Sequence, residues 1–244
     1  GEEVEELYER YWKPFDEPFW HEKVRQGRLI RPRSDLFMQH YLASRHFAEI
    51  PVTHLFVEYK HWIEKRKPFA TVAAEVAAIA SAREDYRNFI CAPPASVLGR
   101  FARFLDVFDV GTIQPLILTI AEASLPEGEV QDILSVLESF ILRRSICGLP
   151  TKAYNRVFLS IASSLKSAGI SSAALRSQLM NAVGETSLWP SDELFSEAFI
   201  RRAGYKTLSQ AKIALTLMRI FERLHSSKTE RLTLDSELSV EHLM

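Results

Sequence analysis

The spacing of apolar and polar residues predicts helices along most of this chain. In EEVEELYERYWKPF, at residues 2–15, apolar side chains recur at three- and four-residue steps, which is typical of a helix with one apolar face. Pro14 and Pro18 are expected to end or bend this helix. Further helices are predicted at residues 34–47, 53–66, 71–90, 95–109, 112–124 and 128–147, with Ser34 and Asp35 as the cap of the first of these.

A break at Gly148-Leu149-Pro150 divides the pattern into two parts. Glycine accepts the left-handed backbone that ends many helices, and proline cannot continue a helix. Thr151 is placed to cap the next helix, and Ser191 is placed to cap a later one after a break at Trp189-Pro190. A last apolar helical face lies within residues 206–226. We therefore expect two helical subdomains, at residues 1–147 and 151–230.

The last residues have a different pattern. In LTLDSELSV, at residues 232–240, apolar residues tend to alternate with polar ones, which indicates a β-strand. A single strand cannot satisfy its own backbone hydrogen bonds, so its partner is expected to follow it. The predicted fold class is therefore all-α, an irregular multi-helix bundle with a short β-like C-terminal tail.

Composition is that of an ordinary globular protein, with 47% hydrophobic and 25% charged residues. No apolar run approaches the roughly 20 residues of a membrane span, and the acidic start is unlike a signal peptide. Cys91 and Cys147 lack the spacing of a metal site, and we expect both to be buried, reduced thiols. The sequence thus predicts a cytoplasmic protein that does not contact a membrane.

Charge is distributed unevenly, although the net charge is only −1. Residues 1–20 contain seven acids and two bases, whereas residues 200–231 contain eight bases and two acids. Such asymmetry is found both in nucleic-acid-binding faces and in solvated helix surfaces. Both interpretations stay open at this point.

Four basic residues surround the GLPT break: Arg143, Arg144, Lys152 and Arg156. Cations near the C-terminal end of a helix interact favourably with its dipole, which is one explanation of Arg143 and Arg144. The other is a basic corner that binds DNA phosphates or docks an adjoining domain.

The histidines do not predict a metal site. His54 and His61 lie seven residues apart on one predicted helix, about 10 Å along its axis, which is too far for one metal ion to bridge. His242 follows the predicted C-terminal strand. An imidazole there could act as a general base, or could simply lie on the surface.

Several runs of the sequence resemble the GmrSD-type restriction endonucleases, which belong to the modification-dependent (type IV) class. LESFILRRSICGLPTKAYNRVFLSIASSL, at residues 137–165, resembles their central segment. LTLDSELSVEHLM resembles the start of their C-terminal nuclease domain. The N-terminal part is similar through Tyr11-Trp12, RPRSDLFMQHYL and PVTHLFVEYKHWI, so that the resemblance covers most of the chain in order.

This resemblance implies a three-part parent protein that cuts modified foreign double-stranded DNA. Its parts are a ParB-like nucleotide-hydrolysing domain, a helical middle region and an HNH (His-Me finger) nuclease. His242 matches the general base of the nuclease motif. The implied cofactors of the parent are a divalent metal such as Mg²⁺ and a nucleoside triphosphate, and the implied partners are its own flanking domains and DNA.

The match is incomplete at Met244, because the Pro-Gln of the family motif and the later metal ligands are not in this sequence. We therefore expect residues 232–244 to be a truncated start of the nuclease domain, and this chain alone to be inactive and to hold no cofactor. The alternative is a free-standing all-α module that binds other proteins and has no association with a nuclease.

Overall fold

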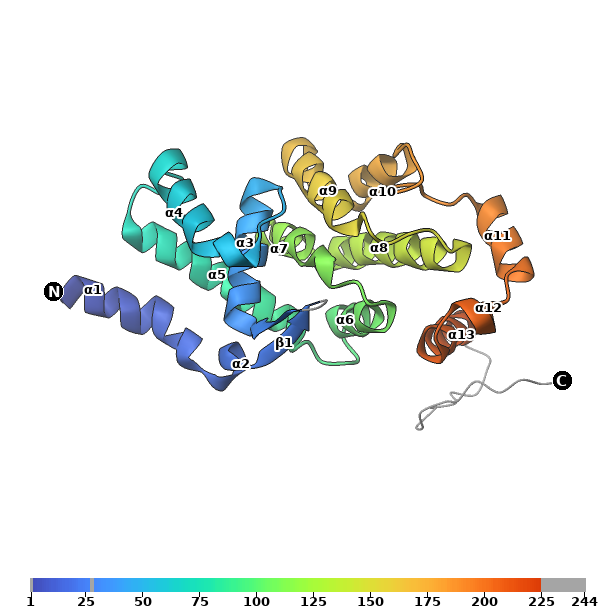
Figure 1. Cartoon of the computed structure of the whole chain (residues 1–244), viewed down its shortest axis with the longest axis horizontal. Coiled ribbons are helices and arrows are strands. Elements are labelled where there is room, and N and C mark those ends of the chain that lie inside the picture. The colour runs from blue at the N-terminus through green and yellow to red at the C-terminus, as the bar shows by residue number, and fades with distance from the viewer. Residues whose placement is uncertain (1, 27–28, 225–244) are drawn as a thin grey trace.

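The computed structural model describes residues 2–26 and 29–224 (Figure 1). It is 75% helical and 3% strand, which confirms the predicted all-α class. The predicted strand at residues 232–240 and His242 lie outside the described residues. Within the described ranges, no helix combines the length and the apolar composition that crossing a membrane requires.

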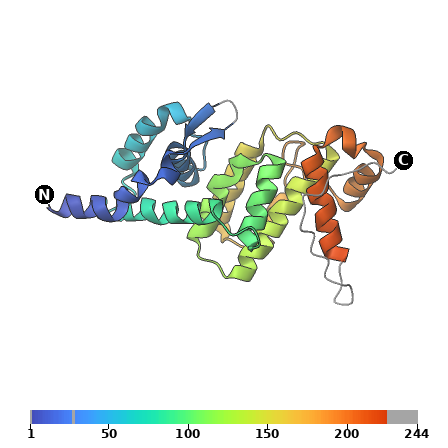
Figure 2. The ribbon, with the colours of Figure 1, turned by 90° about the horizontal axis from the view of Figure 1, so that it is seen from below.

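The N-terminal segment is a chain of short helical pieces. α1 (Glu2–Leu7) continues through a π-helical turn (Tyr8–Trp12) and a 3₁₀ turn (Lys13–Asp16) to α2 (Pro18–His21). The predicted single helix at residues 2–15 is therefore interrupted, because Pro14 has no N–H group for the helical hydrogen-bond ladder. Both views of the chain show α1 projecting from the body (Figure 2).

A two-stranded antiparallel hairpin follows, formed by β1 (Lys23–Gln26) and β2 (Leu29–Pro32). Val24 is paired with Arg31 in its register. The sequence pattern did not predict this hairpin, because two four-residue strands rich in charged side chains are too short to show a clear alternation. It places Pro32 immediately before the next helix.

Three helices build an aromatic core around this hairpin: α3 (Arg33–His46), α4 (Leu55–Arg66), which follows a 3₁₀ turn at Val52–His54, and α5 (Val72–Ile90). The predicted Ser34–Asp35 cap is wrong, since α3 begins at Arg33 after Pro32 and has no side-chain cap. Thr71 does cap α5, because its hydroxyl accepts a hydrogen bond from the Ala74 amide at 3.1 Å. The buried aromatic residues of this core are Phe15, Trp20, Phe37, Tyr41, Trp62 and Tyr86.

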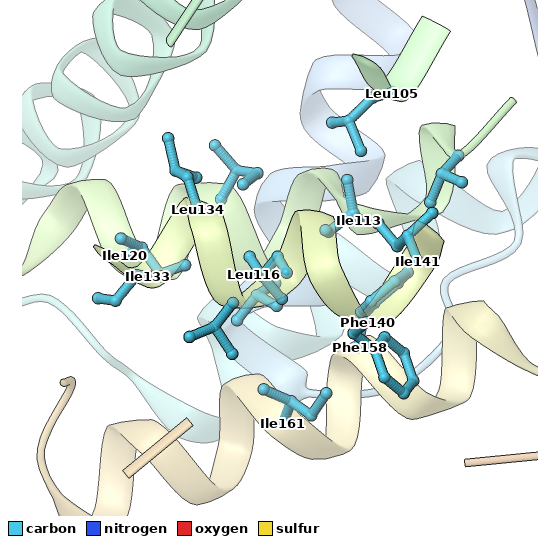
Figure 3. Close-up of a cluster of buried hydrophobic side chains, with 14 of the residues drawn as sticks. Leu105, Ile113, Leu116, Ile120, Ile133, Leu134, Phe140, Ile141, Phe158 and Ile161 are labelled. Atoms are coloured by element: carbon cyan, nitrogen blue, oxygen red, sulfur yellow. The ribbon is translucent and has the colours of Figure 1, made fainter. Parts of the chain in front are cut away.

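The larger core is formed by α6 (Val97–Phe108), α7 (Gln114–Glu122), which follows a 3₁₀ turn at Gly111–Ile113, α8 (Glu127–Cys147), α9 (Tyr154–Ala168) and α10 (Ser172–Met180). Figure 3 shows part of it, with Phe140 of α8 and Phe158 of α9 among its buried side chains. Neither ring has exposed surface. The boundary expected between residues 147 and 151 thus falls inside one continuous core.

Three helices, α5, α7 and α9, contribute buried side chains to both cores. In α7, Leu116 lies in the larger core and Leu118 in the aromatic core. In α9, Phe158 lies in the larger core and Leu159 in the aromatic core. Each helix therefore buries two faces, and the two cores are expected to unfold together.

The remaining helices are α11 (Asp192–Arg201), α12 (Gly204–Thr207) and α13 (Gln210–Leu224). Ser191 caps α11 as its sequence predicts, since its hydroxyl accepts from the Leu194 amide. The predicted helix at residues 206–226 is broken at Leu208, whose backbone is extended. α11 packs on α8 and α13 packs on α6, so these last helices rest on the larger core (Figure 1).

We predict that Phe158→Ala lowers the free energy of unfolding by about 3–5 kcal/mol, because it leaves a cavity in the larger core. Chemical denaturation of the purified chain measures this loss. Phe56→Ala is the matched control, since Phe56 is 77% exposed. A Phe158→Ala variant as stable as the Phe56→Ala variant would contradict the described packing.

Candidate functional site

Arg144, one of the four predicted basic residues, is completely buried at the end of α8. Its guanidinium donates hydrogen bonds to three backbone carbonyls: Pro150 at 2.8 Å, Leu188 at 2.9 Å and Glu185 at 3.1 Å. The rings of Phe140 and Tyr154 lie 5.4 and 5.5 Å from the guanidinium carbon. Arg144 therefore holds the segment before α11 against the α8–α9 corner, and it does not face a ligand.

Gly148 forms this corner, as the sequence predicts. Its φ of 68° is left-handed, and its amide donates to Ser145 while the Leu149 amide donates to Arg144. A Cβ atom at this position would lie 2.2 Å from the guanidinium of Arg202. That guanidinium donates to the Cys147 carbonyl at 2.7 Å, so a side chain at Gly148 would add the cost of a left-handed backbone and would displace Arg202.

Arg143 docks α11 onto α8. Its guanidinium forms an ion pair with Asp192 at 2.5 Å and donates to the Pro190 carbonyl at 3.0 Å. The ring centroids of Phe195 and Trp189 lie 5.1 and 5.7 Å from it. Both Arg143 and Arg144 therefore connect parts of the same chain.

Lys152 and Arg156 behave differently. Both are exposed, and no acidic partner is found for either among the described residues. They line a groove of about 800 Å³ beside the start of α9, together with Gln178 of α10 and the segment at residues 182–187. The structure thus separates the four predicted residues into an internal pair and an exposed pair.

A second groove, of about 780 Å³, lies between α6, α8 and α13 and is lined by four arginines: Arg100, Arg143, Arg219 and Arg223. Glu138 is its one acidic residue, and Arg219 forms an ion pair with it at 3.0 Å. Burial raises the pKa of Glu138, and the nearby charge of Arg219 opposes this effect. We call this feature the arginine groove.

The sequence analysis did not identify the arginine groove. Its residues come from three helices, and Arg100 is more than 100 residues from Arg219. The one available signal was the excess of basic residues at 200–231, which contains Arg219 and Arg223 but indicates neither their position nor their partners.

The histidines and cysteines form no metal centre in the part of the chain that is described, where no group of three or more potential ligands occurs. Cys91 and Cys147 are free thiols, but the expected burial of both is wrong, since Cys91 is exposed and Cys147 is half-buried. His40 is buried beside Tyr86, and burial lowers its pKa to about 4. The imidazole is therefore neutral at pH 7.

Comparison with known protein families, with curated proteins and with solved structures finds no match to this chain. The properties of the two grooves therefore carry the functional argument, together with the resemblance of the sequence runs.

We predict that Arg144→Met lowers the free energy of unfolding by about 2–4 kcal/mol, because the carbonyls of Pro150, Glu185 and Leu188 lose their donor. Arg156→Met, at an exposed position, should change it by less than about 0.5 kcal/mol. Urea denaturation of both variants provides the comparison. Equal stability of the two variants would mean that the Arg144 hydrogen bonds contribute little.

We also predict a pH effect from His40. In the unfolded chain its pKa is near 6.5, whereas burial holds it near 4 in the folded chain, so protonation favours unfolding as pH falls through this interval. Between pH 7 and pH 5 the free energy of unfolding should fall by about 2 kcal/mol more in the wild type than in His40→Gln. Parallel curves of unfolding free energy against pH for the two proteins would contradict the assignment of this pH effect to His40.

Proposed function

We propose that this chain is the helical middle region of a modification-dependent DNA restriction endonuclease, linking an upstream nucleotide-hydrolysing domain to a downstream HNH nuclease. The observation that supports this most is the structural role of residues 137–165, the run with the most distinctive resemblance. They form the α8–α9 corner, in which Arg144 is buried and hydrogen-bonded to the Pro150 carbonyl and Gly148 has a left-handed backbone.

A linking role needs a body that moves as one unit. The cores are joined through α7 and α9, and Arg143 and Arg144 attach the residues that follow α10 to the same body. Closely packed cores transmit displacement because they deform little. α1 and α13 lie at opposite ends of the long axis, so the two flanking domains would contact different ends (Figure 1).

The chemistry of the parent would come from residues outside this body. His242, which lies beyond the described residues, is the proposed general base that accepts a proton from water as the water attacks a DNA phosphodiester. The described residues offer no cluster of metal ligands, so we assign the divalent metal and the nucleoside triphosphate to other parts of the parent. Together with the flanking domains, modified double-stranded DNA is the proposed partner.

One observation favours the second candidate, a protein-interaction module. α1 and the adjoining turn expose Val4, Tyr8 and Trp12, and α4 exposes Phe56 and Val57. Exposed apolar side chains that lie together can mark a surface for another protein. The two candidates differ in whether the product of the complete gene cuts DNA.

We predict that the complete gene product cuts modified DNA in the presence of Mg²⁺ and a nucleoside triphosphate, and that His242→Ala slows cutting by about 10²–10⁴-fold. His54→Ala is the control, since His54 is exposed on the helical body. Cleavage of modified and unmodified plasmid DNA on agarose gels measures this. Absence of cutting, or equal cutting by His242→Ala and the wild type, would reject the nuclease assignment.

A further inference from the structure

The arginine groove combines charge with a regular row of polar side chains. α8 contributes Gln131, Ser135, Glu138 and Ser139, which recur at three- and four-residue steps along one side of the helix. α6 contributes Arg100, and α13 contributes Arg219 and Arg223. α6 contacts both α8 and α13, so the three helices form one surface.

Two of the four arginines are neutralised within the fold. Arg219 donates to both carboxylate oxygens of Glu138, at 3.0 and 3.4 Å, and thereby joins α13 to α8. Arg143 is paired with Asp192. These two contacts hold together the helices that form the groove. The positive charge that is not paired in this way belongs to Arg100 and Arg223.

Arg100 and Arg223 are exposed, and neither forms an ion pair with an acidic side chain among the described residues, although the nearby charge of Arg100 lowers the pKa of Glu138. The hydrogen bond of Arg100 within the chain is a long one, 3.3 Å to the Ala95 carbonyl. The groove thus presents two unpaired guanidinium groups, one from α6 and one from α13, beside the hydroxyl and amide groups of α8.

We propose that the arginine groove binds the phosphate backbone of double-stranded DNA, with Arg100 and Arg223 contacting phosphate oxygens. Guanidinium groups bind phosphate through paired hydrogen bonds, and serine and glutamine side chains supply further contacts to the backbone. From Gln131 to Leu142 the lining of α8 extends about 16 Å, and phosphates of one strand occur every 3.4 Å along the DNA axis, so several can be reached. The choice of DNA over RNA rests on the proposed function.

Other ligand classes fit the groove less well. Small-molecule sites are lined mainly by apolar and aromatic side chains, whereas eight of the twelve residues that line this groove are polar or charged. A protein partner would be anchored by buried aromatic or aliphatic contacts. None of the exposed large apolar side chains of the described residues, such as those on α1 and α4, lines this groove. An acidic protein segment therefore enters only as an outcome of the test.

The test measures binding of this chain to a fluorescent 30-base-pair duplex, by anisotropy, at 50–200 mM salt. For Arg100→Ala/Arg223→Ala, the slope of log K against log salt should be smaller by about 1.8, because each lost phosphate contact removes about 0.9. Between 50 and 200 mM salt, the affinity of the wild type should therefore fall about tenfold more than that of the variant. Circular dichroism checks that the variant is folded.

Two other double variants make the comparison specific. Arg66→Ala/Arg176→Ala removes the same charge from exposed positions on α4 and α10, and it should keep the wild-type slope. Arg100→Lys/Arg223→Lys retains the charge, and it should keep the slope while weakening binding. Lys152→Ala/Arg156→Ala tests the other groove, and it should also bind with the wild-type slope.

The inference is overturned if the wild type does not bind the duplex, or if Arg100→Ala/Arg223→Ala has the wild-type slope. It is also overturned if poly-glutamate competes as well as unlabelled duplex of equal charge, because an acidic protein segment would then explain the site. This experiment is independent of cleavage. Groove-dependent binding by a chain whose complete gene product does not cut DNA would contradict only the proposed nuclease role.

Discussion

The burial of one charged side chain, Arg144, constrains the rest of the C-terminal half. A guanidinium with no exposed surface needs hydrogen-bond acceptors, because removing a charge from water is costly, and the two terminal nitrogens of Arg144 have them while its Nε has none. Its acceptors come from two segments, Pro150 in the α8–α9 corner and Glu185 and Leu188 before α11. The chain must therefore return to the end of α8 after α10.

This return determines where the last helices lie. Once residues 185–190 are held at the end of α8, Arg143 can pair with Asp192 at the first turn of α11. α13 then packs on α6, and Arg219 pairs with Glu138. Arginines thus have two roles in this protein. Arg143, Arg144 and Arg219 connect its parts, whereas Arg100 and Arg223 face the groove that those connections create.

The sequence predicted the long helices because their periodic apolar faces are a local signal, and α5, α8 and α9 are present where they were expected. It predicted the Gly148 corner and the Ser191 cap because backbone chemistry there depends on single residues. It missed the β1–β2 hairpin, because four-residue strands are too short to show a clear alternation, and it missed the break at Leu208. Arg144 shows why the candidate site could be predicted only in part. An arginine at a helix end has the same local sequence pattern whether it is buried or exposed.

Hydrogen exchange of the chain, measured with and without a DNA duplex, tests most directly whether DNA binds at the arginine groove. The account predicts that DNA slows exchange in peptides from α6 and α13, which carry Arg100 and Arg223, and leaves α9 and α10 unchanged. Protection confined to α9 and α10, beside Lys152 and Arg156, would contradict it and would place the nucleic-acid surface at the other groove.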